Sequence, residues 1–159
     1  KVSSKHICLG LAAVSWPGRL EIMHRQPTVI IDGAHNLDGA VSLSKALNEI
    51  FIYRRLILVI GMLADKEREK VVAKLAPLAA AVIVTRPENP RAGDWEALAG
   101  IARHYVKRVE VIASIPAALT YAVQMASASD LICATGSLYM IASAREWFKK
   151  LNKEELASQ

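Results

Sequence analysis

Apolar residues along this chain gather in short unbroken runs that alternate with longer segments of helical spacing. The runs are rich in Val, Ile and Leu and lack the alternation of a strand with one solvated face, so we expect a sheet covered on both faces. The predicted strands are Thr28–Asp32, Arg55–Gly61, Ala80–Thr85, Val109–Ala113 and Leu131–Thr135, with a weaker one at Leu20–His24. The predicted helices are Asp38–Ile50, Lys66–Leu78, Asp94–Tyr105, Ile115–Ala126 and Ser137–Lys150.

Strands separated by helices of this length predict right-handed crossovers and a parallel sheet. The fold class is therefore α/β: a doubly wound, mostly parallel six-stranded sheet with helices on both faces, Rossmann-like, with Leu20–His24 as an antiparallel edge strand. Asp94 is expected to cap its helix, and Pro116 suits the first turn of another. A further helix is predicted before Trp16. The chain starts within that pattern and without Met, which suggests a fragment or a processed chain.

Length and composition indicate one domain with its own core, since 159 residues are 53% hydrophobic. The net charge of +5 favours small anionic ligands. Nucleic acid is not expected as a partner, because no dense basic run with interleaved aromatic residues occurs. A membrane is not expected either, since no apolar run approaches the roughly 18 residues of a span and no signal peptide opens the chain. Cys8 and Cys133 belong to no Cys/His cluster, and we expect buried free thiols in the reducing cytoplasm.

Candidate site residues lie where strands end, because open parallel sheets bind ligands beyond the carboxyl ends of their strands. Arg19, which a Pro-Gly turn holds, suits phosphate oxygens. Asp32 would accept hydrogen bonds from a ribose or an amine, or would only cap the next helix. His35 would lie beside a substrate carboxylate or pair with Asp32. A metal site is not favoured, because the sequence offers no third ligand nearby. Asn36 is interpreted as a helix cap.

The later loops add four candidates. Lys66 would reach a phosphate, or is a surface lysine behind an Asp65 cap. Arg91 belongs to a stiff basic loop that either lines an anionic pocket or forms a solvated turn. Gly136 allows close approach of the backbone to a ligand, and Ser137 places a hydroxyl at the positive end of a helix.

Three familiar motifs are missing. The chain has no G-x-x-x-x-G-K-[ST] loop for ATP phosphates, no G-x-G-x-x-G after the first strand and no G-x-S-x-G elbow. The residues by themselves therefore indicate an anion-binding α/β domain without a complete catalytic set.

Five segments in order nevertheless resemble one family across almost the whole chain. The resemblance is to the C-terminal domain of folylpolyglutamate synthase and dihydrofolate synthase, in the Mur ligase superfamily. The matching segments are Trp16–Glu21, Asp32–Asn36, Gly61–Glu67, Arg86–Arg91 and Thr135–Tyr139. Two positions depart from the family pattern, since Leu37 replaces a common proline and Glu67 a common aspartate.

The resemblance implies an ATP-dependent ligase that adds glutamate to folates, or to dihydropteroate, through an acyl phosphate. It implies that Arg19 and Asp32 contact ATP, and that His35 and Ser137 hold the incoming glutamate. Further candidates for the same site are Asn36, Lys66, Arg91 and Gly136. The implied cofactors are ATP and Mg²⁺, with the metal ligands in an N-terminal ATPase domain that this chain lacks. Residues 1–159 are thus expected to be a monomeric closing domain, inactive in isolation, whose partners are its own ATPase domain, folate and glutamate.

Two other interpretations remain open at the level of sequence. One is a different Mur-type amino-acid ligase, acting on a peptidoglycan precursor or on cyanophycin. The other is a stand-alone module that binds a nucleotide or an amino acid. A G-x-x-G-K-[ST] motif upstream in the same reading frame would exclude the module.

Overall fold

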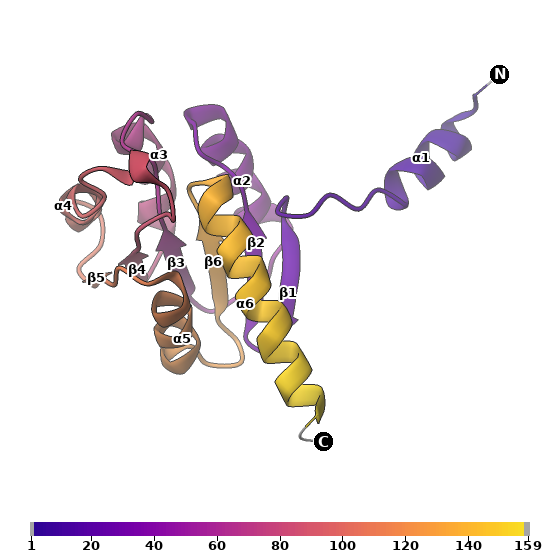
Figure 1. Cartoon of the computed structure of the whole chain (residues 1–159). Helices are drawn as coiled ribbons and strands as arrows, with labels where there is room; N and C mark the ends of the chain where they lie inside the picture. Colours follow the sequence, from indigo (N-terminus) through magenta and orange to yellow (C-terminus); the bar gives the residue numbers. More distant parts are fainter. Residues whose placement is uncertain (1, 158–159) are drawn as a thin grey trace.

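The computed structural model describes residues 2–157 and has three layers, with one sheet between two sets of helices (Figure 1). The strands are β1 (Glu21–Arg25), β2 (Thr28–Asp32), β3 (Leu56–Ile60), β4 (Ala81–Val84), β5 (Val109–Val111) and β6 (Leu131–Thr135). The helices are α1 (Ser4–Ala12), α2 (Leu37–Glu49), α3 (Arg68–Leu75), α4 (Ala97–Arg103), α5 (Ile115–Met125) and α6 (Leu138–Ala157). Two 3₁₀ turns, η1 (Ala76–Leu78) and η2 (Pro90–Ala92), complete the order.

The strand order is β1-β2-β6-β3-β4-β5. Of these strands, only the edge strand β1 is antiparallel to its neighbour, β2, and the other neighbouring strands are parallel. The predicted fold class and the antiparallel edge strand are confirmed. In register, Thr135 of β6 lies between Asp32 of β2 and Ile60 of β3. The carboxyl ends of these strands therefore meet at one edge of the sheet, although β6 comes last in the chain.

Successive side chains of each central strand feed two separate cores. In β6, Leu131 and Cys133 pack in the core that α2, α3 and α4 cover, while Ile132 and Ala134 pack in the core under α5 and α6. This double burial explains why the strands are continuous apolar runs without a polar face.

Two helices are shorter than the sequence pattern predicts. Helix α3 ends at Leu75 and continues only as the turn η1, because Pro77 has no N–H to donate to a further helical turn. The prediction that Asp94 caps α4 is wrong. Glu96 occupies that N-cap position, and the Asp94 carboxylate instead pairs with Arg68.

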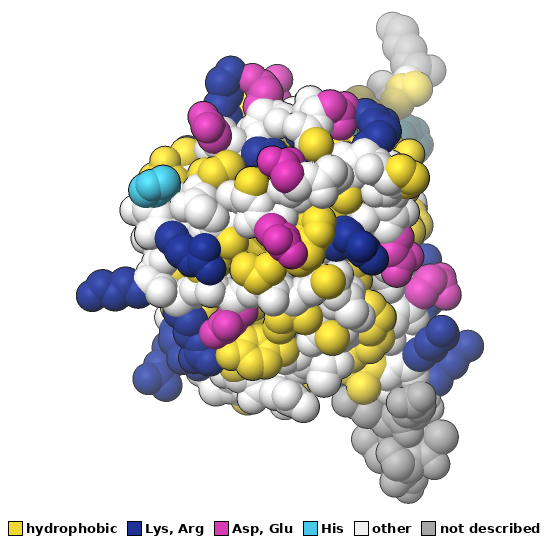
Figure 2. Space-filling model, turned by 60° about the vertical axis from the view of Figure 1, so that its left-hand side comes forward, with side chains coloured by type: hydrophobic (Ala, Val, Ile, Leu, Met, Phe, Trp, Pro, Cys, Tyr) yellow, Lys and Arg dark blue, Asp and Glu magenta, His cyan; other side chains and the backbone are white. Residues whose placement is uncertain are grey.

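Helix α1 stands away from the sheet at the end of an extended segment (Figure 1). None of its residues is buried, so the predicted burial of Cys8 is wrong, whereas that of Cys133 is confirmed. Within residues 2–157, no helix is both long and apolar enough to cross a membrane. Figure 2 turns the edge formed by α4 and β5 toward the reader and shows acidic, basic and apolar side chains interspersed over that face.

Candidate functional site

A pocket of about 140 Å³ lies at the carboxyl ends of the central strands. Segments far apart in sequence line it: the loop after β2, the loop after β3, the turn η2 and the start of α6. Five of the predicted site residues meet there, namely His35, Lys66, Arg91, Gly136 and Ser137. Residues from these separate segments therefore form one candidate site.

The first turn of α6 gives the pocket a polar wall. Gly136 has φ +110°, and a Cβ there would lie 2.7 Å from the carbonyl oxygen of Gly61, so the two loops touch backbone to backbone. Ser137 is buried, and its Oγ accepts a hydrogen bond from the N–H of Tyr139 at 3.2 Å. The hydroxyl hydrogen of Ser137 is left to donate to a ligand, at the positive end of a long helix.

His35 is oriented by its own loop. Its Nδ1 lies 2.9 Å from the carbonyl oxygen of Gly33, and because a carbonyl only accepts, Nδ1 carries the hydrogen. Nε2, the other ring nitrogen, has no partner among the described residues and is left to contact a ligand. Asn36 does not line the pocket, and its side chain caps α2 by accepting from the N–H of Gly39 at 2.9 Å, as predicted.

Lys66 and Arg91 make the lining of the pocket cationic. Asp65 forms an ion pair with Arg91 and lies 3.9 Å from the amine of Lys66, so it does not cap α3. The hydrogen bond from Arg91 lowers the pKa of the Asp65 carboxyl. One carboxylate thus faces two cations, which leaves positive charge for an anionic ligand.

Arg19 lies beside this pocket on a turn that several hydrogen bonds hold. The N–H of Gly18 donates to Glu21 at 2.7 Å, and the N–H of Gly33 donates to the carbonyl of Gly18 at 2.8 Å. A Cβ on Gly33 would come within 2.9 Å of Nη1 of Arg19, so the guanidinium lies directly over the end of β2. It makes no hydrogen bond or ion pair with the residues that the structure describes, and an anion could bind it without displacing a protein group.

Asp32 is largely buried beneath these groups. Its two oxygens accept from the N–H of Leu20 and from the N–H of Ala34, both at 2.9 Å. Leu20 follows Arg19 and Ala34 precedes His35, so one carboxylate fixes the backbone beside both of these residues. Asp32 does not act as the α2 cap, a role that Asn36 fills.

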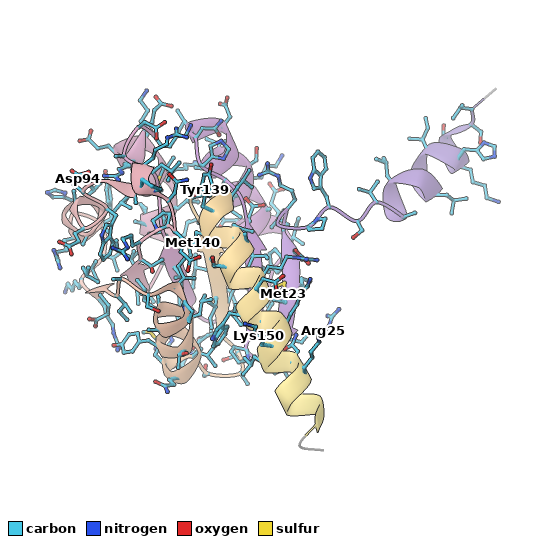
Figure 3. The ribbon with its side chains drawn as sticks, viewed as in Figure 1. Met23, Arg25, Asp94, Tyr139, Met140 and Lys150 are labelled. Atoms are coloured by element: carbon cyan, nitrogen blue, oxygen red, sulfur yellow. The ribbon has the colours of Figure 1, made fainter. Side chains whose placement is uncertain are left out.

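Leu63, Leu138 and Tyr139 also line the pocket and were not singled out from the sequence. Figure 3 labels Tyr139 at the first turn of α6, at the same end of the molecule as Asp94. The sequence could have indicated Tyr139 as a site residue, because it lies two residues after Ser137 in the first turn of a predicted helix. Within the described part of the chain, no three His, Cys, Asp or Glu side chains gather where they could hold a metal ion.

Known proteins resemble this chain in both sequence and fold. A family described as "Mur ligase, glutamate ligase domain" matches residues 18–138. A probable bifunctional folylpolyglutamate synthase/dihydropteroate synthase of Haloferax volcanii is 37% identical over 145 residues, covering 91% of this chain and 17% of that protein. A dihydrofolate synthase/folylpolyglutamate synthase of Mycobacterium tuberculosis is 48% identical over 90 residues, covering 57% of this chain and 18% of that protein.

Solved structures agree in fold. The folylpolyglutamate synthase of M. tuberculosis complexed with ADP superposes with a TM-score of 0.86 at 34% identity, over 93% of this chain and 36% of that one. FolC of Escherichia coli in complex with DHPP and ADP gives a TM-score of 0.85 at 28% identity, over 96% of this chain and 36% of that one. This chain thus spans less than a fifth of the two curated relatives and about a third of these solved chains.

Proposed function

Because the chain belongs to the Mur ligase family, as its glutamate ligase domain, we propose that it is the glutamate-binding part of an ATP-dependent ligase that extends folates or dihydropteroate. The observation that carries the proposal is the single pocket lined by His35, Lys66, Arg91, Gly136 and Ser137. Glutamate bears two carboxylates and one ammonium group, and this lining offers both cations and the start of a helix.

Ser137 and the start of α6 would bind one carboxylate of glutamate, through the hydroxyl hydrogen and the positive helix end. Lys66 and Arg91 would bind the other carboxylate. Nε2 of His35 would contact the amino group of glutamate and orient the amine that attacks. The domain thereby contributes the position and orientation of the nucleophile, which lowers the barrier by making the attack effectively intramolecular.

Arg19 would bind the phosphates of ATP, because its guanidinium has no partner among the described residues. Asp32 would contact the nucleotide only through lone pairs that its two backbone donors leave over. ATP, when bound, supplies the phosphoryl group that activates the folate carboxylate, and displacement of phosphate by the glutamate amine completes the amide. No three His, Cys, Asp or Glu side chains of the described residues gather as metal ligands, and we propose that the Mg²⁺ ligands lie in a preceding ATPase domain, over which this domain closes.

The test is phosphate release by the full reading frame with MgATP, glutamate and either tetrahydrofolate or dihydropteroate. Arg19→Ala and His35→Ala should each lower turnover at limiting substrate by about tenfold or more, because each removes at least one charged hydrogen bond to a substrate. Arg19→Ala should raise the KM for ATP, and His35→Ala the KM for glutamate. Exposed Arg103 and His104, near the end of α4, provide matched controls whose alanine variants keep wild-type kinetics.

Glutamate-dependent turnover that falls in both variants and in neither control supports the ligase and both residue roles. Absence of turnover with either folate contradicts the proposal and favours another amino-acid ligase or a binding module. The 159-residue chain on its own should release no phosphate, and turnover by it would contradict the assignment of the ATPase machinery to another domain.

A further inference from the structure

Arg68, the first residue of α3, is a buried arginine outside the pocket. Its guanidinium has five N–H donors, and each one is used. Nε donates to the carbonyl of Leu63 at 3.1 Å, and Nη2 donates to the carbonyls of Ala92 at 2.7 Å and Met62 at 3.3 Å. Nη1 donates to the carbonyl of Asp94 at 3.3 Å and to its carboxylate at 2.7 Å. Only 9% of the Arg68 side chain is exposed.

These acceptors belong to two different loops. Met62 and Leu63 follow β3, in the loop that carries Lys66, while Ala92 ends the turn η2, which carries Arg91, and Asp94 follows that turn. The guanidinium therefore joins the two segments that make the cationic wall of the pocket. Figure 3 labels Asp94 on the α4 side of this junction.

The remaining links between the two loops are few. The N–H of Ala64 donates to the carbonyl of Arg91 at 2.8 Å, and Asp65 pairs with Arg91 on the surface. The surface pair is largely exposed, so solvent screens it and its contribution to loop spacing is small. The buried fork of Arg68 is the extensive connection, with four backbone carbonyls held at once.

We propose that Arg68 is a positioning residue that sets the separation of Lys66 and Arg91 and thereby the affinity of the pocket for glutamate. The inference rests on the proposed function. Arg68 does not line the pocket and touches no substrate. Its role depends on the planar guanidinium, because a lysine offers three donors from one atom and cannot reach both loops in the same way.

The experiment compares Arg68→Lys with Arg55→Lys in the full reading frame. Arg55 donates two hydrogen bonds to the buried carboxylate of Asp130, at the amino ends of β3 and β6. It therefore provides a second paired arginine that is remote from the pocket. Arg68→Lys should raise the KM for glutamate about tenfold, as the loss of roughly one charged hydrogen bond in the substrate complex. It should leave the KM for ATP within about twofold and kcat close to wild type, the pattern of lost uniform binding. Arg55→Lys should change neither KM.

A second variant covers the outcome in which Arg68→Lys does not fold. The Asp94 side chain is 75% exposed, so Asp94→Ala removes one acceptor of Arg68 with little risk to folding, and it should raise the KM for glutamate in the same direction by a smaller factor. An unchanged KM for glutamate in the folded variants overturns the inference, as does a parallel rise in Arg55→Lys. Failure of the wild-type protein to use glutamate at all refutes instead the proposed function.

Discussion

Gly136 is the position where the geometry of the pocket depends most directly on the absence of a side chain. It joins β6 to α6 with φ +110°, in a region that residues with a Cβ rarely adopt. A Cβ there would lie 2.7 Å from the carbonyl oxygen of Gly61 and 2.9 Å from Cγ of Met62. The nearest obstacle is backbone, which cannot rotate away as a flexible side chain can.

The cost of Gly136→Ala has two parts. Holding alanine at this φ costs about 1–3 kcal/mol. Forcing a methyl group against the β3 loop costs about another 1–3 kcal/mol, as in other overpacked sites. We therefore expect a loss of about 2–6 kcal/mol, a large fraction of the roughly 5–15 kcal/mol that stabilise a typical domain.

Urea denaturation of the chain, followed by circular dichroism, measures this loss. Gly100→Ala is the matched control, because Gly100 lies inside α4 and a Cβ added there would meet no heavy atom within 4 Å. There alanine should stabilise the helix by about 0.5–1 kcal/mol, the difference in helix propensity. Equal effects of the two substitutions, or a Gly136→Ala protein as stable as wild type, would refute the reasoning.

Three further outcomes can be measured on the same chain. A thiol reagent should label exposed Cys8 in the native protein but Cys133 only on unfolding, because burial raises the pKa of the Cys133 thiol; mass spectrometry counts the labels. Hydrogen bonds from Arg55 lower the pKa of Asp130, so the stability that the pair contributes is present above the unfolded pKa of about 4 and is lost as the pH falls through the lower folded pKa. The stability gap between wild type and Asp130→Asn in urea titrations should therefore shrink from about pH 6 to about pH 2. Asn36→Ala should cost about 1 kcal/mol in the same titration, while Asn36→Asp, which keeps the cap acceptor, should retain wild-type stability.

Most of the architecture could be predicted from local pattern. Strands β2 and β6 begin and end where the apolar runs predict, and the weak first strand pairs antiparallel at the edge. The errors lie at helix ends. A proline shortens α3, and Asp94 serves Arg68 instead of α4, because a distant guanidinium is a stronger partner than the first N–H groups of a short helix.

Arg68 shows most clearly what a sequence pattern cannot reveal. Beside Lys66, Glu67 and Glu69 it reads as one more charged residue at the surface of a helix. Its burial depends on two loops that the strand order of the sheet places together. Nothing in the local spacing of charges distinguishes a solvated arginine from one whose five donors are all bound to protein.

The sequence by itself determined the strands and helices of this protein. The reason is that the spacing of apolar residues, over only a few positions of the chain, shows which face of each strand or helix is buried. It also indicated the candidate site residues, since the ends of parallel strands are where such sheets bind ligands. The tertiary structure alone decided that β6 lies between β2 and β3, which brings Thr135 within 3.3 Å of the carbonyl of Ala34, 101 residues away. That strand order places Ser137 beside His35 and makes one pocket of four segments, and it follows from long-range pairing that no periodicity encodes.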